Sequence, residues 1–144
     1  MIMNKSFQEK SIWISLVAIS LIFGYYFLRV FKIAAEDEIN VAESIVLLIS
    51  VIVMVIIVEV VSHIILALRT RPEAQDERDR LIELKATRNA YFVLAFGIFL
   101  PIACIAVSVR PFIVAHVIMF IFVLSEIAGF LTQLFYYRRG IWGE

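Results

Sequence analysis

Residues 41–68 read VAESIVLLISVIVMVIIVEVVSHIILAL, a stretch in which almost every side chain is apolar. An α-helix rises about 1.5 Å per residue, so about 20 apolar residues suffice to cross the hydrocarbon core of a bilayer. The stretch is long enough to do so, and its second half carries two ionisable groups, Glu59 and His63. It predicts a transmembrane helix with polar chemistry inside the membrane.

Three further stretches meet the same criterion of length and composition, at residues 11–28, 89–109 and 111–137. The chain has 144 residues, of which 62% are hydrophobic and 18% are charged. A soluble domain has about half apolar and about a quarter charged residues, so that class is excluded. Little of the chain lies outside the four stretches. The sequence therefore predicts an all-α, integral membrane four-helix bundle in contact with the lipid bilayer, forming one domain over residues 1–144.

The basic residues predict the orientation of the four spans. The two terminal segments and the central loop lie on one side of the membrane when the number of spans is even, and they carry ten of the thirteen Lys and Arg residues: Lys5, Lys10, Arg69, Arg71, Arg78, Arg80, Lys85, Arg88, Arg138 and Arg139. Loops rich in Lys and Arg stay in the cytoplasm. We therefore expect both termini and the central loop to be cytoplasmic, in the plasma (inner) membrane of a prokaryote.

Local signals predict where the helices begin and bend. Pro111 suits the first turn of the fourth span, because a helix needs no N–H there. Pro101 lies inside the third span and should kink it just after Gly97. Asn40 and Glu43 have the spacing of a capping box. Small residues recur at four-residue spacing, which permits close helix approach and is compatible with a homo-oligomer: Ser11/Ser15, Ser20/Gly24 and Ser125/Gly129.

The central loop between residues 72 and 90 is strongly charged and contains no glycine. We expect a cytoplasmic helix that begins near Pro72 and continues into the third span. It could be a solvated extension that holds the topology, or a docking surface for a cytoplasmic or membrane protein partner. The candidate docking residues are Asp76, Glu77, Arg78, Asp79, Arg80 and Lys85. The formal net charge of +0 gives no indication of direct nucleic-acid binding.

Two carboxylates are predicted near the middle of the membrane. Glu59 lies ten residues before Arg69 and Glu126 lies twelve before Arg138, or about 15–18 Å along a helix. Ionisable residues at such depth are costly and are candidates for function. Helical spacing puts Ser62 and His63 on the face of Glu59, and Gln133 on the face of Glu126. We expect these five residues to form a polar seam between the second and fourth spans.

Three interpretations of the seam remain open. Glu59 could pair with His63 or bond a neighbouring helix and so specify packing. Glu59 and Glu126 could share a proton with His63 as a relay. Alternatively, Glu59, His63 and Glu126 could be ligands of a divalent cation. No other cofactor is predicted.

Two segments of the chain resemble those of other proteins: Asp76-Glu77-Arg78-Asp79-Arg80-Leu81-Ile82-Glu83-Leu84-Lys85-Ala86 and the terminal Tyr136-Tyr137-Arg138-Arg139-Gly140. They resemble a group of small prokaryotic four-span membrane proteins of unknown activity, which have such a segment before the third helix. The resemblance covers mainly the C-terminal half and implies a regulatory accessory role. It transfers no site residues.

Two functions follow from these observations. The first is a non-enzymatic accessory or regulatory membrane protein that presents its charged cytoplasmic helix to a partner. The alternative is a proton- or divalent-cation-linked carrier or sensor that uses Glu59, His63 and Glu126. The chain has no nucleophile–base pair and no HExxH motif, so an enzyme is not predicted.

Overall fold

The computed structural model describes residues 7–35, 41–69 and 76–139. Over these ranges the chain is all helical, as the sequence predicts. The helices are α1 (Phe7–Ala34), α2 (Val41–Arg69), α3 (Glu77–Gly97), α4 (Phe99–Ala106) and α5 (Pro111–Arg139). Because α3 and α4 follow each other almost without interruption, they count as one span, and four segments are long and apolar enough to cross a membrane. The protein has the build of a multi-pass membrane protein.

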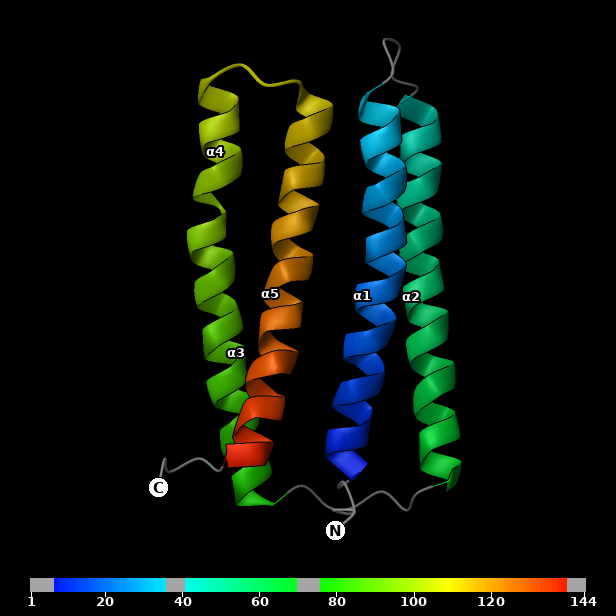
Figure 1. The fold of residues 1–144 in the computed structure, drawn as a ribbon, viewed down its shortest axis with the longest axis vertical. Coiled ribbons are helices and arrows are strands. Elements are labelled where there is room, and N and C mark those ends of the chain that lie inside the picture. The colour runs from blue at the N-terminus through cyan, green and yellow to red at the C-terminus, as the bar shows by residue number, and fades with distance from the viewer. Residues whose placement is uncertain (1–6, 36–40, 70–75, 140–144) are drawn as a thin grey trace.

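The helices contact one another in the order α3/α4, α5, α1, α2, as Figure 1 shows. The extensive contacts join α3 and α4 to α5, α5 to α1, and α1 to α2. The start of α1, the end of α2, the start of α3 and the end of α5 lie together. We call this the basic end, because Lys10, Arg78, Arg80, Arg138 and Arg139 are close to it. Helices α1 and α5 therefore form the centre of the bundle.

The two helices at the flanks of the bundle expose their apolar side chains. Helix α2 exposes Ile49, Ile57 and Ile64, and α4 exposes Phe99 and Ile105. Exposed apolar surface of this extent is unfavourable in water but suits contact with lipid tails. The surface of the protein is thus adapted to a bilayer.

The third span is interrupted at Ile98, between α3 and α4. Pro101 has no N–H to donate to the carbonyl of Gly97 four residues earlier, so the helix ladder breaks there. The interruption falls at the position where the sequence predicts a kink, just after Gly97. Gly97 also allows close packing, because a Cβ at this position would collide with the side chain of Ile121 on α5.

The N-terminus of α3 is capped by acidic side chains. The Asp79 backbone N–H donates to Oδ1 of Asp76 at 2.7 Å, and the Asp76 N–H donates to Oδ2 of Asp79 at 3.4 Å. Asp76 itself has an extended backbone, so the helix begins at Glu77 and not near Pro72 as expected. Residues 72–75 and the expected cap at Asn40 lie outside the described residues. The capping box of Asp76 and Asp79 defines the first turn of α3 at Glu77.

Helix α4 ends in a Schellman motif, which leads into the turn to α5. Val109 N–H donates to the Cys104 carbonyl and Ser108 N–H to the Ile105 carbonyl, with Ser108 in the left-handed region at φ 58°. This motif ends α4 at Ala106, earlier than the predicted residue 109. Helix α5 then begins at Pro111, as predicted.

Candidate functional site

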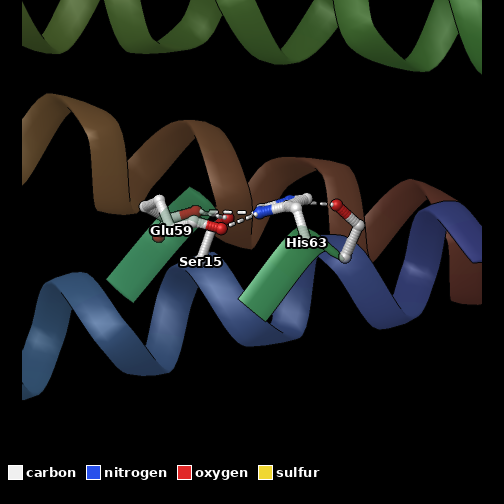
Figure 2. Close-up of polar contacts among 4 residues, drawn as sticks. Ser15, Glu59 and His63 are labelled. Atoms are coloured by element: carbon white, nitrogen blue, oxygen red, sulfur yellow. Dashed lines mark hydrogen bonds and ion pairs between the residues drawn. The ribbon is translucent and has the colours of Figure 1, made fainter. Parts of the chain in front are cut away.

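Two ionisable residues in the second half of α2, Glu59 and His63, face α1. Glu59 and His63 are one helical turn apart, and His63 Nδ1 lies 3.4 Å from Glu59 Oε2. Two serines of α1 complete the group: Ser15 Oγ donates to Glu59 Oε2 at 2.7 Å, and Ser11 Oγ lies 2.7 Å from His63 Nε2. Figure 2 shows Ser15, Glu59 and His63 close together where α2 faces α1. The result is a row of polar contacts, Ser11–His63–Glu59–Ser15, that joins α1 to α2 through two hydrogen bonds and the His63–Glu59 ion pair.

The contacts of His63 define which ring nitrogen can accept a proton. Its Nδ1 lies 2.7 Å from the Glu59 backbone carbonyl, which can only accept a hydrogen bond. Nδ1 therefore carries the hydrogen, and in the neutral ring Nε2 accepts from the Ser11 hydroxyl. When His63 is protonated, Nε2 becomes a donor and the Ser11 hydroxyl reverses to accept. Proton uptake at His63 thus takes place at the nitrogen that faces Ser11.

The two oxygens of Glu59 have different environments. Oε2 accepts from Ser15 and lies beside His63. Oε1 is buried and has no hydrogen-bond partner among the described residues. A buried carboxylate oxygen without a donor is unfavourable when the group is charged, because no hydrogen bond replaces the lost hydration. This asymmetry leaves one oxygen that could carry a proton without breaking an existing contact.

Ser11 also lines a polar cavity of about 190 Å³ at the basic end. The cavity brings together α1, α3 and α5, with Asp79 and Glu83 from α3 and Gln133 and Tyr137 from α5. Tyr137 Oη donates to Asp79 Oδ1 at 2.8 Å. A cavity of this polarity and size can hold water. Ser11 therefore lies between His63 and a cavity that can hold water.

The five residues of the predicted polar seam do not lie together in the structure. Glu59 and His63 come together, but the extensive contacts of α2 are with α1 and not with α5. Ser62 is half-buried and takes no part in the chain of hydrogen bonds. Glu126 lines a separate cavity between α1, α2 and α5, and Gln133 lines the cavity at the basic end. The expected seam between the second and fourth spans is replaced by one between the first and second.

Few ligands for a divalent cation are available around Glu59 and His63. Within the described residues no three His, Cys, Asp or Glu side chains are grouped so that they could hold a metal ion. Glu59 and His63 supply two ligands, and the nearest additional oxygens belong to serine hydroxyls. The arrangement suits proton binding better than cation coordination.

The second histidine is in a different environment. The His116 ring stacks on Tyr26 with ring centroids 5.8 Å apart, and its Nδ1 lies 2.7 Å from the Phe112 carbonyl. Its Nε2 is buried with no partner in the described part of the chain. No carboxylate contacts it there, so His116 is a useful reference for His63.

The candidate docking residues at the start of α3 fall into two groups. Asp76 and Asp79 form the cap, Asp79 also binds Tyr137, and Lys85 Nζ lies 5.3 Å from the centroid of the Tyr136 ring. These contacts are internal to the chain. Glu77, Arg78 and Arg80 are exposed, beside the exposed Leu81 and Leu84.

Ser11 and Ser15 are the site residues that the sequence did not assign to the polar group. Their four-residue spacing indicates one helix face, but a serine in a span is as common at a plain packing contact. Only the pairing of α1 with α2 gives them partners. No family model, curated protein or solved structure matches this chain.

Proposed function

We propose that this chain is a proton-responsive membrane protein, a carrier or sensor, in which the Glu59–His63 pair takes up and releases a proton. The observation that carries the proposal is the row of polar contacts Ser11–His63–Glu59–Ser15. In this row the Oε1 atom of Glu59 is buried and has no hydrogen-bond partner among the described residues. Ionisable residues inside membrane spans commonly form proton relays.

The pair has a physical reason to exchange a proton. A charged group in a low-dielectric environment is unfavourable unless an opposite charge compensates it. One shared proton makes Glu59 and His63 together neutral, either as an ion pair or as two uncharged groups. A second proton, or the loss of the first, leaves a net charge between α1 and α2. Titration of the pair should therefore alter how these two helices pack.

The test is the protonation state of the two histidines. His63 and His116 are the only two in the chain, so protein labelled with ¹⁵N-histidine gives two assignable signals in detergent micelles. We expect the neutral His63 ring to have its hydrogen on Nδ1, and Nε2 to take up the second proton on acidification. In Glu59→Gln the response of the His63 signals to pH should change, because the carboxylate beside the ring is gone.

His116→Gln is the matched control and should leave the His63 signal unchanged. A His63 ring with its hydrogen on Nε2 would contradict the proposed proton route. A His63 titration that is the same in Glu59→Gln would contradict the proposed pair.

The second candidate function is the accessory role, in which α3 binds a partner protein. The observation that favours it is the exposure of Glu77, Arg78 and Arg80 around Leu81 and Leu84. Charged rims around apolar side chains are typical of protein interfaces. On this proposal the basic end lies in the cytoplasm, in agreement with its Lys and Arg content.

A photo-activatable residue at position 84 tests this second candidate in native membranes. We expect a discrete cross-linked product from the exposed Leu84 position and none from the buried Ile82 position. The charge reversal Arg80→Glu should abolish the product. A product that survives Arg80→Glu unchanged, or no product from position 84, would contradict the docking role.

A further inference from the structure

Glu126 is a further ionisable residue of the membrane-spanning region, and it does not belong to the proton pair of Glu59 and His63. Glu126 on α5 lies on the wall of a cavity of about 370 Å³ between α1, α2 and α5. The other residues that line this cavity are apolar, and they include the aromatic residues Phe23 and Phe122. The cavity lies one helical turn from the proton pair, because Ile19 follows Ser15 by four residues and Val55 precedes Glu59 by four.

Glu126 lacks a neutralising partner within the part of the chain that the structure describes. It makes neither a hydrogen bond nor an ion pair there. The nearest basic residue further along α5 is Arg138, twelve residues or about 18 Å away. Between Lys10 and Arg29, α1 has no Lys or Arg, and α2 has neither before Arg69. His63, the other base on α2, lies beside Glu59. The carboxylate therefore depends on a proton or on an external cation for neutralisation.

We propose that this cavity binds a lipophilic organic cation, with Glu126 as its counter-ion. The apolar walls select a ligand with a large hydrocarbon surface, and the single carboxylate selects a positive charge. Aromatic rings add attraction for a cation when it lies over their faces. The volume is within the range of small-molecule sites, about 300–1,000 Å³. Binding at Glu126 does not require Glu59 or His63, so this inference stands apart from the proposed proton pair.

Equilibrium dialysis of the purified full chain in detergent, with radiolabelled tetraphenylphosphonium, tests the proposal. We expect the wild type to bind this cation and Glu126→Gln, which keeps the shape but removes the charge, to bind it at least about tenfold more weakly. Tetraphenylborate has the same shape and the opposite charge, so it should not compete. Glu59→Gln is the matched control, because it removes a carboxylate of the same region outside the cavity lining, and it should bind like the wild type.

Several outcomes would overturn the proposal. The first is that the wild type does not bind the cation, and the second is that Glu126→Gln binds it as tightly as the wild type does. The third is that tetraphenylborate competes with the bound cation, because the cavity would then accept any apolar molecule, such as a lipid tail. If Glu126→Gln does not fold, Val55→Phe fills the cavity and keeps the carboxylate. Binding that survives in Val55→Phe would also contradict the assignment. A loss of binding in Glu59→Gln alone would place the cation at the proton pair instead.

Discussion

Gly97→Ala should lower the free energy of unfolding by about 1–2 kcal/mol, although alanine is the better helix former. A Cβ at position 97 would collide with Cγ2 of Ile121, a side chain that is only 5% exposed. The β-branched isoleucine has one strongly preferred rotamer in a helix, so it cannot turn away easily. Overpacking of this kind costs about 1–3 kcal/mol, which exceeds the gain of up to about 1 kcal/mol from removing a helical glycine.

Gly24→Ala is the control for this substitution. No atom lies within 4 Å of a Cβ built at Gly24, so the same change there should be neutral or stabilising. Thermal unfolding in detergent measures both variants. In an Ile121→Ala background the collision is removed, and Gly97→Ala should no longer destabilise. A destabilisation that persists in that background would mean that the close approach of α3 and α5 is not the cause.

Ser15→Ala should lower the free energy of unfolding by about 1–2 kcal/mol. Within the described residues, the Ser15 hydroxyl is the one hydrogen-bond donor within 3 Å of Glu59 Oε2, and Oε1 has no partner. Hydrogen bonds between membrane helices average about 0.6 kcal/mol. The effect should be larger here because the acceptor is a carboxylate, and bonds to charged groups are worth about 1.5–3 kcal/mol.

The other serines give the comparison that tests this reason. In the described structure the hydroxyl of Ser62 makes no hydrogen bond to the pair, so Ser62→Ala should change stability little. Ser11→Ala should cost less than Ser15→Ala, because water in the polar cavity can replace the hydroxyl at His63 Nε2. In Glu59→Leu, which removes the acceptor, Ser15→Ala should be nearly neutral. An equal cost of Ser15→Ala with and without Glu59 would show that the serine acts through packing alone.

The long apolar stretches were enough to determine the class of this protein and the number of its spans. Whether a segment spans the membrane depends on the transfer of about 20 consecutive residues into lipid. That transfer does not depend on which helices are neighbours. For the same reason the break near Gly97 and the start of α5 at Pro111 could be predicted, since proline acts on its own helix. The start of α3 was missed because two carboxylates, Asp76 and Asp79, cap each other and fix the first turn.

The neighbours of each helix were decided only by the tertiary structure. Glu59, Ser62, His63, Glu126 and Gln133 were recognised as polar residues on helix faces, but periodicity does not say which face meets which helix. Because α1 packs between α2 and α5, Glu59 and His63 meet the serines of α1, while Glu126 faces an apolar cavity. The sequence thus determined that this chain carries ionisable residues in its membrane-spanning segments. The packing order of the helices determined that one carboxylate contacts a histidine and a serine and that the other has no partner among the described residues.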